Sequence, residues 1–130
     1  MALLVKDFMT PKEEVTSPQD SVLSAIELMV DNDVGSVIVE EDDRVVGIFT
    51  ERDLLRRYLQ SQSKTLYMSV GEVMSRPVVT ISPEDTLSNA FRIMAEKDIR
   101  HLPVVDDQQR LVGYLTWRNM FQYISKELSR

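Results

Sequence analysis

The stretch VGSVIVEEDDRVVGIFTERDL, residues 34–54, decides the fold. It holds a β-branched run, an acidic turn at 40–43, a second apolar run with a glycine inside, and a helix start near Glu51. Two strands joined by a short polar turn form a β-hairpin. The same order returns in IRHLPVVDDQQRLVGYLTWRNM, residues 99–120. We therefore expect two copies of one strand–turn–strand–helix element.

Alignment of the chain with itself extends this duplication toward the N-terminus. Val5 matches Val70, and identical residues keep this offset of 65 until the second turn, where one extra residue changes it to 66, so that Thr50 matches Thr116. Ordered, nearly gap-free matches over half the chain are typical of an internal repeat. We assign residues 1–60 to repeat 1, 61–69 to a polar linker and 70–130 to repeat 2.

An amphipathic helix precedes each hairpin, and its apolar residues recur every three or four positions. Asp20 or Ser21 would cap the first of these helices. The apolar positions are Val22, Ala25, Ile26, Met29 and Val30 in repeat 1, and Leu87, Ala90, Phe91, Ile93 and Met94 in repeat 2. A short strand is expected at 78–81, with a more polar counterpart at 13–16. The expected fold class is α+β, with two βαββα repeats packed as a pseudo-twofold pair, because neither repeat closes a core alone.

Composition and charge restrict the function. The formal net charge is −6, from 15 Lys and Arg against 21 Asp and Glu, which argues against nucleic acid as the main partner. The absence of cysteine excludes disulfides and thiolate chemistry, and a single histidine with four glycines leaves no catalytic or phosphate-loop motif. The apolar run at 2–5 is too short for a secretory signal or a membrane span. We expect a cytoplasmic protein that is not an enzyme and needs no metal or cofactor.

The chain resembles a pair of cystathionine-β-synthase-type (CBS) domains, known as a Bateman module. The resemblance rests on VKDFMT, VTSPQDSVLSAIELM and the first hairpin stretch in one copy, and on VGEVMSRPVVTISPEDTLSNAFRIM and the second hairpin stretch in the other. It implies a regulatory module that binds an adenosine compound such as AMP, ADP, ATP or S-adenosylmethionine in the cleft between the repeats. It also implies a homodimer, since such pairs often form a flat disc.

The helix start Thr50-Glu51-Arg52-Asp53 has two compatible interpretations. Threonine followed three residues later by an acidic residue is typical of a helix-capping box. A carboxylate also accepts hydrogen bonds from both hydroxyls of a ribose, and the resemblance implies that Thr50 and Asp53 bind a ribose. In the second copy the same positions hold Thr116 and Asn119. Asparagine lacks the charge, so we expect ribose binding there to be weaker or lost.

Arg100 and His101 precede the second hairpin, where repeat 1 has Gly35 and Ser36. A lone histidine is usually a packed or surface residue, but beside arginine it is also suited to a phosphate. The resemblance implies a phosphate contact at this place in some pairs. Arg52 and Arg118 are more readily explained as surface residues.

The remaining candidate residues lie on the strands. By resemblance, Thr16 of repeat 1, with Thr80 and Ile81 of repeat 2, flanks an adenine, although simple strand packing explains them as well. A further set is expected in the core, with some of its members lining the base pocket: Val37, Ile38, Leu102 and Pro103. The methionines at repeat positions are expected to fill the core.

Two hypotheses follow. In the first, the chain is a stand-alone sensor in which an adenosine nucleotide changes the conformation or the oligomeric state and thereby affects an unknown effector protein. In the second, it is a structural or dimerisation module with no physiological ligand. The pairs Thr50–Asp53 and Arg100–His101 favour the first, while Asn119 favours the second for one of the two sites.

Overall fold

The first helix of each repeat begins and ends in the same way. The computed structural model describes residues 3–12, 14–76 and 78–129, without the side chain of residue 127. Helix α1 (Val22–Asn32) is capped by Ser21, which resolves the two candidates, and helix α4 (Leu87–Lys97) is capped by Thr86. Both end at an aspartate in the left-handed region, Asp33 with φ 53° and Asp98 with φ 52°. A short polar side chain tolerates this conformation better than a bulky one.

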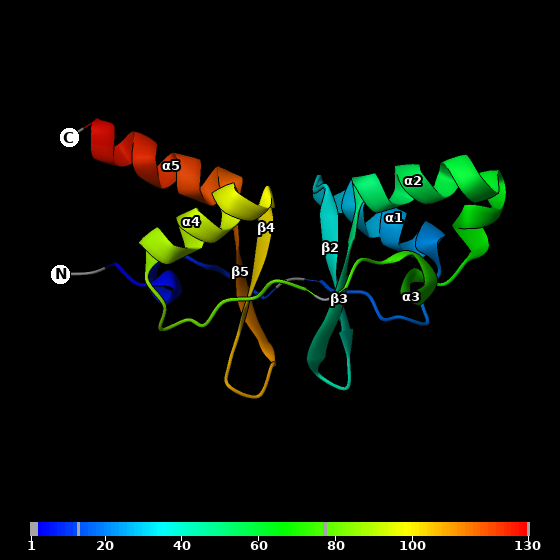
Figure 1. The fold of residues 1–130 in the computed structure, drawn as a ribbon, viewed down its shortest axis with the longest axis horizontal. Coiled ribbons are helices and arrows are strands. Elements are labelled where there is room, and N and C mark those ends of the chain that lie inside the picture. The colour runs from blue at the N-terminus through cyan, green and yellow to red at the C-terminus, as the bar shows by residue number, and fades with distance from the viewer. Residues whose placement is uncertain (1–2, 13, 77, 130) are drawn as a thin grey trace. The chain divides into compact units, whose positions relative to one another are not determined.

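Both expected hairpins are present (Figure 1). In the first, β2 (Ser36–Glu41) pairs antiparallel with β3 (Arg44–Thr50), and in the second, β4 (His101–Val105) pairs with β5 (Leu111–Thr116). The first turn is tighter than the sequence suggested, because the strand continues to Glu41. Asp42 and Asp43 then form the turn with φ of 52° and 64°. Two residues with positive φ match the twist of a hairpin.

The second helix of each repeat starts directly at the end of a strand. Helix α2 (Glu51–Ser61) follows β3, and α5 (Trp117–Leu128) follows β5, as predicted. No described helix is long and apolar enough to cross a lipid bilayer.

The expected short strands are reduced to single parallel bridges. Thr16 bridges to Val39, and Ile81 bridges to Val104. Residue 13, where the first of these strands was expected to begin, lies outside the described residues. A short strand that was not predicted, β1 (Thr10–Pro11), pairs with β5, and Ser75 forms the corresponding bridge to Ile48.

The chain divides into two compact units that differ from the sequence repeats. Unit 1 contains the described residues of 1–13 and 79–130, and unit 2 contains 14–78. The first segment of each repeat therefore packs in the unit built by the rest of the other repeat. The first segment of repeat 1 forms the 3-10 helix η1 (Val5–Asp7) in unit 1, and the first segment of repeat 2 forms the helix α3 (Val70–Val73) in unit 2. Val5 and Val70 are both fully buried.

Each unit has its own apolar core. In unit 1 it contains Val5, Ile81, Leu87, Ala90, Met94, Leu102, Val104, Leu115 and Met120. In unit 2 it contains Val22, Ala25, Met29, Val37, Val39, Phe49, Val70 and Val73. Met9 and Met74 pack against these cores, so the expected packing role of the methionines is confirmed. Val30, which was predicted on the apolar face of the first helix, lies outside the core, because its side chain is 72% exposed.

The stretch predicted as a linker has structure of its own. After α2 ends at Ser61, residues Gln62–Tyr67 form a 3-10 helix. Thr65 within it is fully buried. The whole stretch belongs to unit 2.

Candidate functional site

The start of α2 is a helix-capping box built from Thr50 and Asp53. The Thr50 hydroxyl oxygen accepts a hydrogen bond from the Asp53 amide at 3.2 Å, and Asp53 Oδ2 accepts one from the Thr50 amide at 3.0 Å. The two groups satisfy backbone donors that the first helical turn leaves open. The capping interpretation is therefore confirmed, and it places a carboxylate at the end of β3.

The other oxygen of Asp53 has a partner that the sequence did not indicate. The Ser75 hydroxyl donates to Asp53 Oδ1 at 2.6 Å. Ser75 lies on the segment that repeat 2 contributes to unit 2, and Asp53 is only 8% exposed. A serine after Met74, aligned with Thr10 after Met9, was the only available signal, and sequence spacing alone does not reveal its partner.

Unit 1 repeats this arrangement with an amide in place of the carboxylate. The Thr116 hydroxyl oxygen accepts a hydrogen bond from the backbone amide of Asn119 at 3.2 Å. The side-chain oxygen Oδ1 of Asn119 accepts one from the backbone amide of Thr116 at 3.1 Å. The same Oδ1 accepts from the hydroxyls of Thr116 at 2.8 Å and Thr10 at 3.3 Å. An asparagine has a single acceptor oxygen, and here three donors already share it.

Thr16 and Ile38 lie together in unit 2. The Thr16 amide donates to the Ile38 carbonyl at 3.0 Å, and the Thr16 hydroxyl donates to Asp20 Oδ2 at 2.9 Å. Hydrogen bonds from the Ser17 amide and the Thr16 hydroxyl hold the pKa of Asp20 below its ordinary value. Ile38 is buried, but strand alternation places it on the face opposite the core residues Val37 and Val39.

Ile81, Leu102 and Pro103 make the corresponding arrangement in unit 1. The Ile81 amide donates to the Pro103 carbonyl at 3.1 Å. Ile81 and Leu102 belong to the core, so their side chains serve packing, whereas Pro103 is buried on the opposite face of β4. Thr80 is half-buried beside them.

Arg100 and His101 differ in what they offer to a ligand. Arg100 is exposed, and its guanidinium lies 5.2 Å from the centroid of the Trp117 ring. His101 lies opposite Thr116 on the neighbouring strand, with its ring 4.8 Å from that of Tyr114. Burial lowers the pKa of His101 from 6.5 to about 4, so the imidazole is neutral at pH 7. Of the pair, only Arg100 brings positive charge.

The predicted site residues are divided between the two units. Thr16, Ile38, Thr50 and Asp53 lie in unit 2. The remaining eight lie in unit 1: Thr80, Ile81, Arg100, His101, Leu102, Pro103, Thr116 and Asn119.

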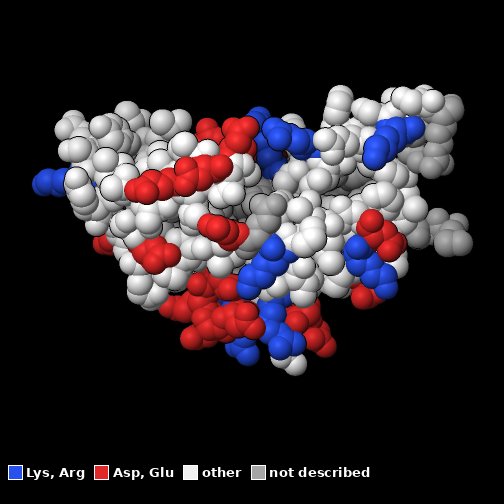
Figure 2. Space-filling view, turned by 180° about the vertical axis from the view of Figure 1, so that it is seen from behind, with Lys and Arg blue, Asp and Glu red and all other residues white. Residues whose placement is uncertain are grey.

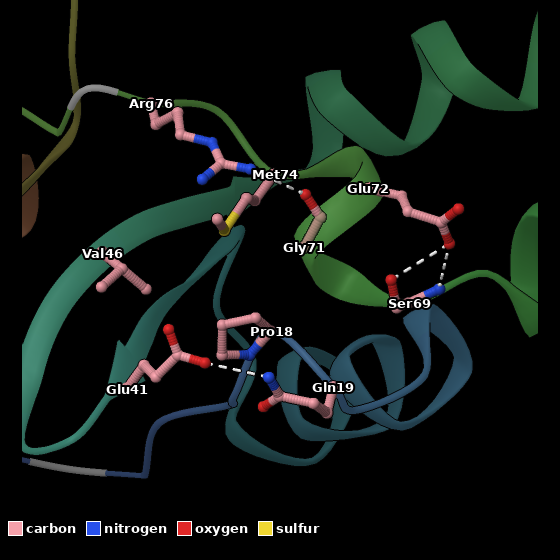
Figure 3. A pocket seen from close by; sticks show the side chains of 9 residues that line it. All are labelled: Pro18, Gln19, Glu41, Val46, Ser69, Gly71, Glu72, Met74 and Arg76. Carbon is pink, nitrogen blue, oxygen red and sulfur yellow. Dashed lines mark hydrogen bonds between the residues drawn. The ribbon is translucent and has the colours of Figure 1, made fainter.

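Unit 2 also has an open cavity of about 530 Å³, which contains none of the predicted site residues (Figure 3). It is lined by Pro18, Gln19, Glu41, Val46, Ser69, Gly71, Glu72, Met74 and Arg76. At the aligned positions of unit 1, Lys6 stands for Gly71 and Glu84 for Gln19, and the two form an ion pair at 3.2 Å. The two units thus differ here as well as at the helix starts.

Acidic side chains gather over the tip of the first hairpin, at the lower edge of Figure 2. Glu41, Asp42 and Asp43 are all exposed there. Among the described residues, no group of three or more His, Asp or Glu side chains is arranged to hold a metal ion.

Known proteins with the same architecture match nearly the whole chain. The CBSX2 protein of Arabidopsis thaliana has a structure with a TM-score of 0.88 and 32% identity, which covers 100% of this chain and 99% of that one. A crystal structure of CBSX2 in complex with AMP gives a TM-score of 0.84 and 33% identity, over 98% and 99% of the two chains.

Curated relatives agree with the structural match. The CBS domain-containing protein YhcV of Bacillus subtilis is 38% identical over 109 residues, which are 84% of this chain and 76% of YhcV. An uncharacterized protein of Methanopyrus kandleri is 34% identical over 107 residues, and this chain spans only 55% of its length. A family model described as CBS domain matches residues 5–60 and again 70–126. The chain therefore belongs to the CBS domain family and carries two copies of that domain.

Proposed function

We propose that the chain is a regulatory module that binds an adenosine nucleotide, with the ribose held at the start of α2. The observation that carries this proposal is the Thr50–Asp53 pair, which presents a nearly buried carboxylate at the end of β3. A carboxylate accepts hydrogen bonds from two neighbouring hydroxyls, as a ribose diol requires. The similarity to CBSX2, whose structure contains AMP, supports the same ligand class.

The other predicted residues would each act within their own unit, Ile38 in unit 2 and Pro103, Arg100 and His101 in unit 1. Ile38 and Pro103 are buried on the faces of their hairpins that do not join the cores, which suits contact with an adenine. Exposed Arg100 would neutralise a phosphate, and its stacking on Trp117 limits its freedom before a ligand arrives. His101, being neutral, would act only as a hydrogen-bond partner.

The output of this module would be regulatory. A ligand changes the balance of two conformations only by the difference in its affinity for them, so an effector protein must distinguish the same two states. We propose no catalytic activity, because the chain has no cysteine and one histidine, whose pKa burial lowers to about 4. A cytoplasmic location stays a prediction from the sequence.

A homodimer is the second part of the proposal, and α5 carries it. Its apolar side chains Trp117, Phe121, Ile124 and Leu128 are 44%, 71%, 44% and 82% exposed. Their spacing of four, three and four residues places them on one helical face. Leu55, Tyr58 and Leu59 of α2 are exposed as well. Self-association through α2 and α5 would remove these surfaces from water, and it would also serve a module without a nucleotide ligand.

Calorimetric titration with AMP, ADP, ATP and S-adenosylmethionine tests the nucleotide proposal. We expect binding of at least one of them, weakened more by Asp53→Ala than by Asn119→Ala, because only Asp53 offers a charged acceptor. Asn119→Ala is the matched control, since it removes the side chain at the equivalent position of the other capping box. No heat and no thermal shift at millimolar ligand would refute nucleotide binding and leave the dimerisation module.

A further inference from the structure

We propose that Ser75 is a latch on Asp53: its hydroxyl holds the carboxylate oxygen that a ribose hydroxyl would take, and ligand binding releases the segment around Ser75. The inference rests on the proposed function, because it assigns to the same carboxylate a competitor within the chain. It makes the segment at 74–76 the first part of the molecule to respond to the nucleotide.

The occupied state of Asp53 is the starting point. Oδ2 accepts from the Thr50 amide at 3.0 Å and Oδ1 from the Ser75 hydroxyl at 2.6 Å. The side chain is 8% exposed, so few directions of approach remain. A carboxylate has about four acceptor positions and only two are filled here, but the low exposure leaves little space beside the present donors, so in our proposal a ribose hydroxyl enters where one of them stands.

Of the two donors, Ser75 is the one that a ligand can replace. The Thr50 amide belongs to the capping box, and its displacement would break one of the two hydrogen bonds of the box and leave a backbone donor without its partner. Ser75 instead lies between α3 and the chain crossing into unit 1, outside any helix or strand, with an exposed side chain. Two backbone hydrogen bonds to Ile48, of 2.8 and 3.1 Å, hold it in place. A ribose hydroxyl is the same chemical group as the serine hydroxyl and would substitute for it directly.

Unit 1 contains the weaker counterpart of this contact. The Thr10 hydroxyl lies 3.3 Å from Asn119 Oδ1, an oxygen that also accepts from Thr116. A hydrogen bond to a carboxylate is shorter and stronger than one to a neutral amide. Both units thus bring a hydroxyl from the exchanged segment to the same place, but only Asp53 combines it with a charged acceptor.

Release of Ser75 would change the positions of the residues next to it in the chain. Met74 and Arg76 flank it and both line the cavity of unit 2 (Figure 3). Met74 also packs closely over Gly47 of β3, where an added Cβ would lie 2.4 Å from its sulfur atom. A ligand at Asp53 would therefore change the wall of this cavity, which Asp53 itself does not line, because Ser75 is bonded directly to two of the lining residues.

Ser75→Ala tests the latch. Without the competing hydroxyl, AMP should bind about tenfold more tightly in calorimetric titration, equivalent to about 1.4 kcal/mol. In the wild type, AMP should raise hydrogen–deuterium exchange at residues 74–76 and at the Ile48 amide, and Ser75→Ala should raise it without ligand. Ser63→Ala is the matched control, because Ser63 is an exposed serine of the same unit. It should change neither measurement.

The outcomes separate the latch from the site itself. Wild-type binding that Ser75→Ala leaves unchanged or weakens would overturn the latch alone, since Ser75 would then be neutral or would help to position Asp53. Binding by Ser75→Ala but not by the wild type would support a latch that is closed under the conditions used. Failure of both proteins to bind any of the four adenosine compounds would overturn the latch together with the proposed nucleotide site.

Discussion

His101 stands at the start of β4, beside the exposed Arg100, yet its ionisation follows its burial rather than its neighbour. Desolvation disfavours the imidazolium form, and the pKa is lowered to about 4. In the unfolded chain the same side chain has a pKa near 6.5. Between these values the unfolded chain binds the proton and the folded chain does not.

The stability of the protein should therefore depend on His101 in a defined pH window. Its contribution is complete above pH 6.5 and is lost as the pH falls toward 4, so the free energy of unfolding should drop by about 2 kcal/mol between pH 6.5 and 4.5. Urea unfolding at these two pH values measures the loss. His101→Gln, which cannot titrate, should flatten the dependence, and an unchanged slope in this variant would contradict the assignment.

The carboxylates whose pKa is lowered affect the stability of the protein at lower pH than His101 does. Asp20, Glu72 and Asp106 accept hydrogen bonds from neighbouring amides, which stabilise their ionised forms. Their contribution is present above their unfolded pKa values of 3.8 to 4.5 and disappears as the pH falls through the lower folded values. The histidine window therefore begins at a higher pH than theirs.

At the scale of elements, α5 exposes an apolar surface that packing within its own unit does not explain. Its inner side reaches the core through Met120, while its apolar stripe at 117, 121, 124 and 128 faces outward. An exposed apolar stripe of this kind typically marks an interaction surface.

A charged residue in the middle of that stripe should prevent self-association. Phe121→Glu should convert a dimer into a monomer with the same circular dichroism spectrum, because Phe121 is 71% exposed and contributes little to the core. Sedimentation equilibrium measures the mass. Gln122→Glu introduces the same charge on the neighbouring face of α5 and should leave the dimer intact. A dimer that persists in Phe121→Glu would place the contact elsewhere.

The elements themselves were largely predictable, since each rests on a local pattern. The helices with three- and four-residue apolar spacing, the two hairpins and both capping threonines were found at the expected positions. Local patterns did not predict contacts between residues that are far apart in sequence. Strand β1 pairs with β5, which lies about a hundred residues further along the chain, and Ser75 binds Asp53, which lies 22 residues before it. Val30 follows the helical period but is exposed, because periodicity alone does not fix the width of a buried face.

At the scale of the whole molecule, the repeats and the compact units obey different divisions. The duplication aligns Val5 with Val70 but does not indicate in which core either residue lies. The sequence pattern is the same whether the first segment of a repeat packs in the core of its own repeat or in the core of the other, so only the structure reveals the exchange. For the same reason, the predicted boundaries at 60 and 70 remain a description of the sequence repeats.

The exchange predicts where a core mutation acts. Val5→Ala should lower the free energy of unfolding by about 2 kcal/mol, since it leaves a cavity in the core of unit 1. Its main effect on hydrogen–deuterium exchange should fall on residues 87–116, far along the chain, and not on 14–61. Val70→Ala is the matched variant and should affect α1, β2 and β3 instead. Protection lost within the mutated residue's own repeat would contradict the exchange.

The exchanged segments also suggest how a chain of this kind can originate. A single ancestral repeat whose first segment packs in a second copy would be a domain-swapped dimer, and its folding would depend on protein concentration. Fusion of the two copies through a short connection preserves the same contacts while it makes them intramolecular, with an effective concentration in the millimolar range. Once the two copies are joined in one chain, each half always pairs with the other half. The sequences of the two halves can then diverge. Asp53 in one copy and Asn119 in the other are a difference of the kind that such divergence would produce.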